Sequence, residues 1–308
     1  MESLDDVAII GAGPAGLAAA IYTGREEMTT TVYEGDVVGG WAALTGTIEN
    51  YPGFPDGVGG VELSDKLEAQ ATKYGAKVKT GTMILGLKQG PHGIELATST
   101  GTKHAKAVLI TTGSDYKRLG VPGEAEFTSK GVHYCATCDG PLYRGKDLIV
   151  VGGGDSAMQE GLFLTKFASH ITMLVRGEKL KGSQLLIDRV SAASDKITVQ
   201  YNTAIERVLD NGKMATGVMT NQGEIKADGI FVFIGQVPNT HWLKDTIELD
   251  ERGFIHTDDN FQTNIGGVFA AGDVRAGAIG QIASAVGEGV SAAIAIREFI
   301  SGHLPIRA

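Results

Sequence analysis

The stretch that decides the fold reads Val7-Ala8-Ile9-Ile10-Gly11-Ala12-Gly13-Pro14-Ala15-Gly16, an apolar run followed at once by a glycine-rich turn. An Ala-rich segment continues to about Tyr22, so the pattern predicts a strand, a tight turn and a helix. Glycines let such a turn approach a pyrophosphate, which the free amides and the dipole at a helix N-terminus attract. The next predicted strand, Thr30–Tyr33, ends at Glu34, where an acid can accept the hydroxyls of a ribose. The stretch therefore predicts a dinucleotide site that favours FAD or NAD over a 2′-phosphorylated nucleotide.

The same design recurs in the middle of the chain. It reads Leu148-Ile149-Val150-Val151 and then Gly152-Gly153-Gly154-Asp155-Ser156-Ala157, before a helical segment to about Phe167. The following predicted strand, residues 171–175, ends at Arg176 where the first unit has an acid. An Arg at this place can meet a 2′-phosphate, which favours NADPH over NADH, although Arg176 can also be an ordinary charge at a strand end.

A third glycine turn lies near the C-terminus, in Gly267-Val268-Phe269-Ala270-Ala271-Gly272-Asp273. Asp273 is placed to bind ribityl or ribose hydroxyls, and the helical spacing of apolar residues predicts a helix over residues 281–300. If the first and last portions share one cofactor, the middle portion is an insertion. The segments that end at Thr112-Gly113 and at Gly235 are the expected hinges on either side of it.

These patterns predict an α/β chain with two Rossmann-like, three-layer nucleotide-binding domains, the second inserted in the first. The expected bounds are 1–113 and 241–308 for the FAD-binding domain and 114–240 for the NAD(P)H-binding domain. The inserted domain also carries the two cysteines of the chain.

Those two cysteines form one motif, Cys135-Ala136-Thr137-Cys138-Asp139. Near a nucleotide fold, a Cys-x-x-Cys pair indicates a redox couple, because it closes a small disulfide ring and its thiols can have lowered pKa values. Asp139 can give a proton to a thiolate or take one from a thiol. His133 leaves half of a zinc site as the alternative, but a closed zinc site needs four ligands and the other histidines are scattered.

Composition excludes several other classes of function. The 308 residues carry a net charge of -9 and no basic run, which argues against a nucleic-acid partner. The N-terminus is acidic where a secretory signal needs positive charge, and no apolar run is long enough for a membrane helix. With so few cysteines, we expect a protein of the reducing cytoplasm. Neither a Gly-x-Ser-x-Gly nor a His-Glu-x-x-His hydrolase motif occurs.

Taken together, these motifs resemble the low-molecular-weight, FAD-dependent thioredoxin reductases of the pyridine nucleotide-disulfide oxidoreductase family, almost from end to end. The motifs shared in order are the first glycine turn, Gly39-Gly40 followed by Thr47-Ile48-Glu49-Asn50-Tyr51-Pro52-Gly53-Phe54, Thr112-Gly113, Cys135 to Gly140, the second glycine turn, and Gly272-Asp273-Val274. The resemblance implies a homodimer whose inserted domain rotates and whose partner is the disulfide of a thioredoxin-like protein.

The resemblance also implies roles for individual residues. Cys138 would face the flavin, Cys135 would attack the partner disulfide, and Asp139 would protonate the leaving thiolate, with no metal. The residues implied to hold FAD are Gly11, Gly13, Pro14, Ala15, Gly16, Glu34, Gly39, Gly40, Trp41, Asn50, Thr112, Gly113, Gly272, Asp273, Gln281 and Ile282. Those implied to hold NADPH are Gly152, Gly154, Asp155, Ser156, Ala157, Arg176 and Lys181.

The chain departs from the family pattern in three places. Val175-Arg176-Gly177 and Lys181 stand where most relatives have His-Arg-Arg and a later Arg, which weakens the expected clamp on a 2′-phosphate. Trp41 replaces a Gln beside the flavin, and Gly280 replaces an Arg. The electron donor therefore stays open between NADPH, NADH, and ferredoxin or another flavin or iron-sulfur carrier.

Two alternatives to an NADPH-dependent enzyme follow. In the first, a carrier protein supplies the electrons, but relatives of that kind often have an aromatic C-terminal tail, and residues 301–308 contain no aromatic residue. In the second, the chain is a non-catalytic nucleotide-binding module, which would have no physical need for the Cys-x-x-Cys-Asp motif.

Overall fold

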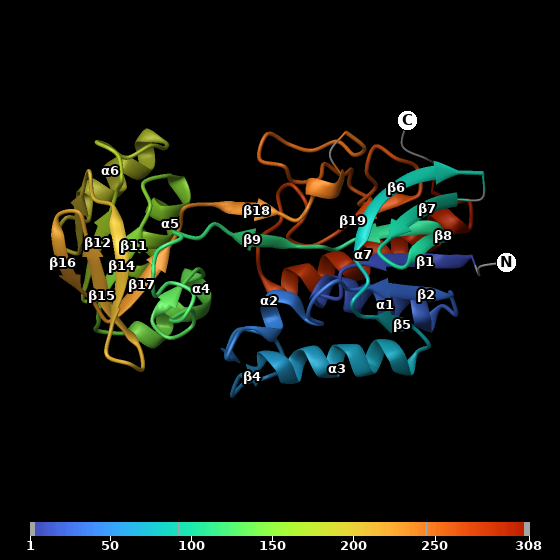
Figure 1. Cartoon of the computed structure of the whole chain (residues 1–308), viewed down its shortest axis with the longest axis horizontal. Coiled ribbons are helices and arrows are strands. Elements are labelled where there is room, and N and C mark those ends of the chain that lie inside the picture. Colours follow the sequence, from blue (N-terminus) through green and yellow to red (C-terminus); the bar gives the residue numbers. More distant parts are fainter. Residues whose placement is uncertain (1–3, 92, 244, 305–308) are drawn as a thin grey trace. The chain divides into compact units, whose positions relative to one another are not determined.

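The computed structural model describes residues 4–91, 93–243 and 245–304 (Figure 1). Residues 1–3 of the acidic N-terminus and 305–308 of the tail lie outside them. The chain divides into two compact units, Met1–Asp115 with Val237–Ala308, and Tyr116–Gln236. The second unit therefore interrupts the first in sequence.

The first unit is built on one sheet with the order β5-β2-β1-β8-β7-β6, in which β19 also pairs with β8. Strands β5, β2, β1, β8 and β19 run parallel, and β8, β7 and β6 form an antiparallel meander. The bounds are β1 (Asp5–Ile10), β2 (Thr30–Tyr33), β5 (Lys77–Lys79), β6 (Ile84–Gly90), β7 (Gly93–Thr98), β8 (Gly101–Ile110) and β19 (Val268–Ala270).

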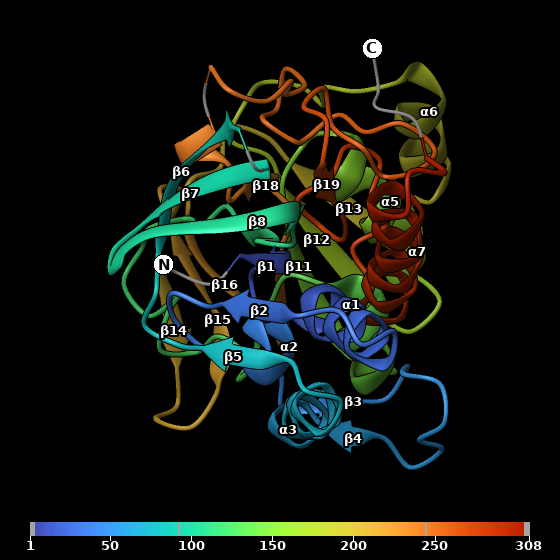
Figure 2. The same ribbon diagram turned by 90° about the vertical axis from the view of Figure 1, so that its right-hand side faces the viewer.

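Both faces of this sheet are covered, which explains the continuous apolar run in β1. Val7 and Ile9 pack into a cluster with α1 (Pro14–Arg25) and α7 (Ile282–Ile300). Ala8 and Ile10 point to the other face, into a cluster with the β6–β7 meander. Figure 2 shows α1 and α7 side by side, with α3 (Gly60–Lys73) next to α1.

The second unit also has three layers. A parallel sheet has the order β10-β17-β11-β12-β13, and the antiparallel strands β14, β15 and β16 form a second sheet. Leu148 and Val150 of β11 pack against helices α5 and α6, while Ile149 and Val151 pack toward β14 and β15. The bounds are β10 (Val132–His133), β11 (Asp147–Val151), β12 (His170–Leu174), β13 (Ile197–Gln200), β14 (Ile205–Asp210), β15 (Ala215–Thr220), β16 (Gly223–Lys226), β17 (Gly229–Val232), α5 (Asp155–Leu164) and α6 (Gln184–Ala192).

The chain passes between the units through β9 (Ser114–Tyr116) and β18 (Gln236–Pro238), which pair with each other. Gly113 and Gly235 stand at these crossovers with φ of 67° and 109°, where a side chain would strain the backbone. The other elements are α2 (Gly40–Ala43), α4 (Ala136–Asp139), η1 (Gly140–Tyr143), η2 (His241–Leu243), β3 (Thr47–Ile48) and β4 (Val58–Gly59). The predicted α/β fold with two Rossmann-like units is confirmed, and α5 ends before the expected Phe167 because the chain turns back after Leu164.

Candidate active site

The first glycine turn joins β1 to α1, and its three glycines have different surroundings. A Cβ at Gly11 would overlap the carbonyl of Thr111, and one at Gly16 would overlap the carbonyl of Gly11. At Gly13 nothing lies within 4 Å of the position that a Cβ would take. Two glycines thus permit close packing, and the third leaves the backbone open to a ligand at the N-terminus of α1, where Pro14 is the first helical residue.

Glu34 is anchored directly over this turn. Its Oε2 accepts a hydrogen bond from the Ala12 amide at 2.7 Å, and its Oε1 accepts one from the Asp36 amide at 2.9 Å. The Gly39 amide in turn donates to the Ala12 carbonyl at 2.8 Å. Gly39 and Gly40 therefore lie against the same turn as Glu34.

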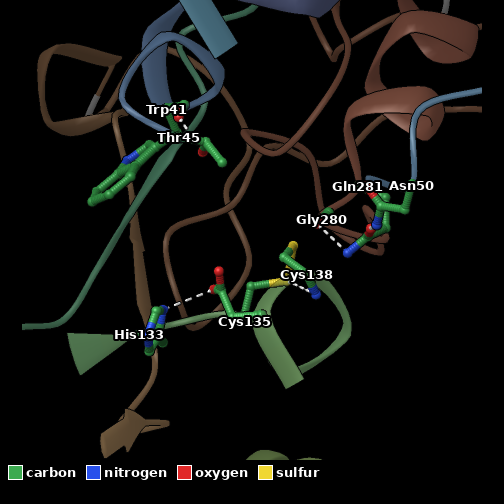
Figure 3. The surroundings of a disulfide bond; sticks show 9 residues. Trp41, Thr45, Asn50, His133, Cys135, Cys138, Gly280 and Gln281 are labelled. Carbon is green, nitrogen blue, oxygen red and sulfur yellow. Dashed lines mark hydrogen bonds and ion pairs between the residues drawn. A yellow bond between two sulfur atoms is a disulfide. The ribbon is translucent and has the colours of Figure 1, made fainter. Parts of the chain in front are cut away.

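Asn50 and Gln281 come together from opposite ends of the sequence. The Asn50 Nδ2 donates to Gln281 Oε1 at 3.1 Å, and Gln281 stands just before Ile282, the first residue of α7 (Figure 3). Trp41 lies on α2, and its indole Nε1 donates to Asp115 Oδ1 at 2.8 Å. Thr112 Oγ1 donates to the Asn239 carbonyl at 3.0 Å, which ties the Thr112–Gly113 segment to the returning chain.

Asp273 follows Gly272 in the third glycine turn. Burial, together with the nearby carboxylate of Glu288, raises the pKa of Asp273 to about 6. Glu288 Oε2 accepts the Gly272 amide at 2.9 Å, and Glu288 Oε1 forms an ion pair with Arg275 at 2.8 Å. Hydroxyl donors from a ligand would stabilise the charged form of the half-buried Asp273, as the sugar chain of a flavin nucleotide would.

The second glycine turn joins β11 to α5 in the second unit. Gly152 has φ of 139°, and a Cβ there would overlap the Phe233 carbonyl. The segment after β12 folds back onto this turn, since the Lys181 amide donates to the Gly153 carbonyl and the Ser183 amide donates to Asp155 Oδ1. Asp155 and Ser156 are exposed at the start of α5, whereas Ala157 is buried in the core of the unit.

Arg176 and Lys181 are exposed on the segment that crosses the turn, as a phosphate clamp requires. In the described part of the chain, neither side chain makes a hydrogen bond or an ion pair. Val175 has a different role: it is buried in the apolar core and lies against Gly153. A cationic residue at that position would have to leave the core, whereas Arg176 and Lys181 are already exposed.

Cys135 and Cys138 are joined by a disulfide bond (Figure 3). Cys135 caps the short helix α4, and the Cys138 amide donates to the Cys135 Sγ at 3.2 Å. Both cysteines and Asp139 are half-buried, so all three retain access to solvent. The structure therefore brings a disulfide and a carboxyl group together in one segment of the second unit.

Sequence reasoning missed two residues of these segments and did not predict the contacts of a third. Glu288 holds the Gly272–Asp273 turn, and its signal in the sequence is that it is the single charged residue between Gln281 and Ile296. Asn239 donates through Nδ2 to the Thr112 carbonyl at 3.0 Å at the crossover. His133, weighed above as a zinc ligand, instead contacts Asp139 and Tyr143.

Among the described residues, no helix is long and apolar enough to span a lipid bilayer. Residues 5–289 match the model of a family described as pyridine nucleotide-disulphide oxidoreductase. The chain is 41% identical to a thioredoxin reductase of Listeria monocytogenes over 297 residues, which cover 94% of this chain and 91% of the relative. It is 39% identical to a thioredoxin reductase of Bacillus subtilis over 305 residues, which cover 97% and 96% of the two chains.

A solved structure of similar fold is the thioredoxin reductase from Streptococcus pyogenes, with a TM-score of 0.92 and 35% identity. The match covers 98% of this chain and 100% of the other. By sequence and by fold, the chain belongs to the pyridine nucleotide-disulphide oxidoreductase family, and within it to the low-molecular-weight thioredoxin reductases.

Proposed function

We propose that this chain is an FAD-dependent thioredoxin-disulfide reductase that takes its electrons from NADPH. The observation that carries the proposal is the Cys135–Cys138 disulfide with Asp139 beside it, in a chain with two glycine turns of the dinucleotide-binding kind. A protein that only bound nucleotides would have no use for a half-buried disulfide next to a carboxyl group. The proposal includes action in the cytoplasm as a homodimer, which rests on the family likeness.

The first unit supplies groups that fit FAD. The open backbone at Gly13 suits a pyrophosphate, Glu34 retains lone pairs for the ribose hydroxyls, and the half-buried Asp273 suits the ribityl hydroxyls. Asn50 and Gln281 offer further polar groups at the start of α7. The bound FAD would carry electron pairs between NADPH and the Cys135–Cys138 disulfide. In this proposal, residues 1–113 and 241–308 bind FAD, and residues 114–240 bind NADPH.

The second unit supplies groups that fit a nucleotide with a 2′-phosphate. Gly152 and Gly154 open the turn, and Asp155 with Ser156 begins the helix. Arg176 and Lys181 are exposed cations that can contact the extra phosphate. Each charge-assisted contact is worth about 1.5–3 kcal/mol, so two of them suffice for a clear preference for NADPH.

The reduced cysteine pair performs the second half of the reaction. The Cys135 thiolate attacks the disulfide of thioredoxin, which breaks that bond and releases one partner sulfur as a thiolate. Asp139 provides the proton for this leaving sulfur. Cys138 then attacks the sulfur of Cys135, so the Cys135–Cys138 disulfide forms again and the second partner thiol leaves.

The test is anaerobic mixing of the purified holoprotein with NADPH, and separately with NADH, while the visible absorbance of the flavin is followed. We expect NADPH to bleach the flavin faster than NADH does. If neither nucleotide bleaches the flavin but dithionite reduces both the flavin and the cysteine pair, the pyridine nucleotide is not the donor and the proposal fails in that part.

A further inference from the structure

His133 is a buried imidazole in direct contact with the carboxyl group beside the redox cysteines. It ends strand β10, only 5% of its side chain is exposed, and its Nδ1 lies 3.2 Å from Asp139 Oδ2 (Figure 3). All the residues involved belong to the second unit. An imidazole in this place contacts one oxygen of the Asp139 carboxyl group and can hold it in position.

The other ring nitrogen is held by Tyr143. His133 Nε2 lies 2.7 Å from the Tyr143 hydroxyl, which is itself buried. Burial, followed by the nearby charges of Asp139 and Asp228, raises the pKa of Tyr143 to about 12, so the phenol keeps its proton. The Tyr143 hydroxyl can then donate to Nε2, which leaves Nδ1, the ring nitrogen that faces Asp139 Oδ2, as the donor.

Aromatic packing fixes the plane of the imidazole. The ring of His133 stacks on Phe231 with centroids 5.1 Å apart and meets Tyr143 edge to face at 5.3 Å. Phe231 is completely buried in β17. Phe231 sets the plane of the ring, and the acceptor oxygen of Asp139 on one side with the Tyr143 hydroxyl on the other favours the tautomer that directs its donor at Asp139.

We propose that His133 is a positioning residue that holds Asp139 for proton exchange with the reacting sulfurs. The Nδ1 contact at 3.2 Å pairs the ring with Asp139 Oδ2 and leaves Oδ1 for the proton that moves from the Cys138 thiol to the leaving thiolate of the partner. This inference rests on the proposed function, because it assigns His133 to the thiol-disulfide exchange that the cysteine pair carries out. The charged groups around the Tyr143–His133–Asp139 chain are Asp228 and Lys146, which form an ion pair at 3.6 Å.

Three substitutions separate positioning from packing. His133→Phe keeps a flat ring on Phe231 but removes the Nε2 hydrogen bond with Tyr143 and the Nδ1 contact with Asp139. His133→Asn places an amide near the position of Nδ1 and can restore the donor to Asp139, and Tyr143→Phe frees the tautomer of an intact imidazole. His170→Phe is the matched control, because His170 also contacts a hydroxyl in this unit, Thr198 Oγ1 at 3.0 Å, but does not contact Asp139.

The measurement is the rate constant at which the dithionite-reduced holoenzyme reduces oxidised thioredoxin under anaerobic conditions between pH 5.5 and 9. We expect His133→Phe to slow this step by about 10- to 100-fold and to change its pH profile, with partial rescue in His133→Asn and an intermediate rate in Tyr143→Phe. Flavin bleaching by NADPH should stay unchanged in all of them. His133→Phe should also add no further loss to Asp139→Asn, since both act through one carboxyl group.

The inference is overturned if His133→Phe keeps the wild-type rate and pH profile, or if its loss simply adds to that of Asp139→Asn. If His133→Phe does not fold, His133→Asn and Tyr143→Phe provide the test instead, and wild-type profiles in both would contradict the positioning role. Failure of the proposed function has a different signature, because the wild-type enzyme would then not reduce thioredoxin at all.

Discussion

At the scale of one residue, the half-buried carboxyl group of Asp273, which we propose binds FAD, lowers the stability of the flavin-free protein at neutral pH. Its pKa is raised from 3.8 to about 6, so between these values the folded protein keeps a proton that the unfolded chain releases. The contribution of Asp273 to the free energy of unfolding is therefore fully present below about pH 4 and is lost as pH rises through 6. The carboxylate is unfavourable at neutral pH unless a ligand donates to it.

Asp273→Asn should accordingly stabilise the flavin-free protein at pH 7.5 by on the order of 1–3 kcal/mol, because the amide needs no charge. The advantage should disappear near pH 4. Urea unfolding of both proteins across this range measures the difference. The same substitution should weaken FAD binding about tenfold, read from flavin fluorescence, since an amide accepts hydroxyl donors less strongly than a carboxylate does. A stability difference that is independent of pH would contradict this account.

Some residues of these sites are predictable from sequence and others are not, for a physical reason. Gly11, Gly13 and Gly16 stand in one short turn, so their spacing alone indicates an open backbone and close packing. Glu288 and Asn239 reach their partners from distant parts of the chain, and no local pattern reports that contact. His133 stands close to Cys135 in the sequence, so it was considered as a zinc ligand. Its contact with Asp139 depends on the fold, and the sequence does not show it.

At the scale of elements, the packing of α7 on α1 depends on one small residue. Gly289 of α7 lies so close to α1 that a Cβ there would overlap the carbonyl of Ala15. Ala15 belongs to the first turn of α1, which follows Gly13 directly. A larger distance between α7 and α1 would therefore displace the first turn of α1 and the glycine turn that precedes it.

Gly289→Ala should lower the free energy of unfolding by about 1–3 kcal/mol and reduce the amount of FAD that stays bound during purification. Gly287→Ala is the matched control on the same helix, because nothing lies within 4 Å of the position that its Cβ would take. That substitution should be neutral or stabilise the protein by up to about 1 kcal/mol. If Gly289→Ala and Gly287→Ala have equal effects on stability and on FAD content, the contact between Gly289 and α1 determines neither quantity.

Elements with strong periodicity were predicted well. The antiparallel strands that cover one face of the parallel sheet in the second unit were not. The strand, turn and helix of each nucleotide-binding motif are local in sequence, and they appear as β1–α1 and β11–α5. The antiparallel strands β14 and β16 are largely exposed, and none of β14, β15 and β16 alternates strictly between buried and exposed residues, so the pattern of this sheet is weak. Which layer covers Ile149 and Val151 is decided by tertiary contacts that the sequence does not display.

At the scale of the whole molecule, the choice of electron donor should follow from Arg176 and Lys181, two exposed cations of the segment that crosses the second glycine turn. Arg176→Ala and Lys181→Ala should each raise the KM for NADPH about tenfold or more, with little change in kcat and no change in the KM for NADH. Lys179→Ala is the control, since Lys179 is exposed on the same segment and lies outside the predicted clamp. A loss that is equal for both nucleotides would show that these side chains do not contact a 2′-phosphate.

The sequence predicted that the middle portion is an insertion on the expectation that the first and third glycine turns share one cofactor, and the chain does divide into two units in this order. The structure places β19 beside β8 and α7 beside α1, so the first unit is completed only by residues from the C-terminal part. The identity of each nucleotide and the roles of the two cysteines remain predictions, since they depend on ligands and a partner.

The most direct test of the central claim counts thiols in thioredoxin after anaerobic incubation with NADPH and a catalytic amount of this enzyme. The account predicts two new thioredoxin thiols for each NADPH oxidised. In Cys135→Ser and Cys138→Ser no thiols should form, although NADPH still bleaches the flavin. Thioredoxin reduction that persists in either variant, or wild-type enzyme whose flavin bleaches without any thiol appearing in thioredoxin, would contradict it.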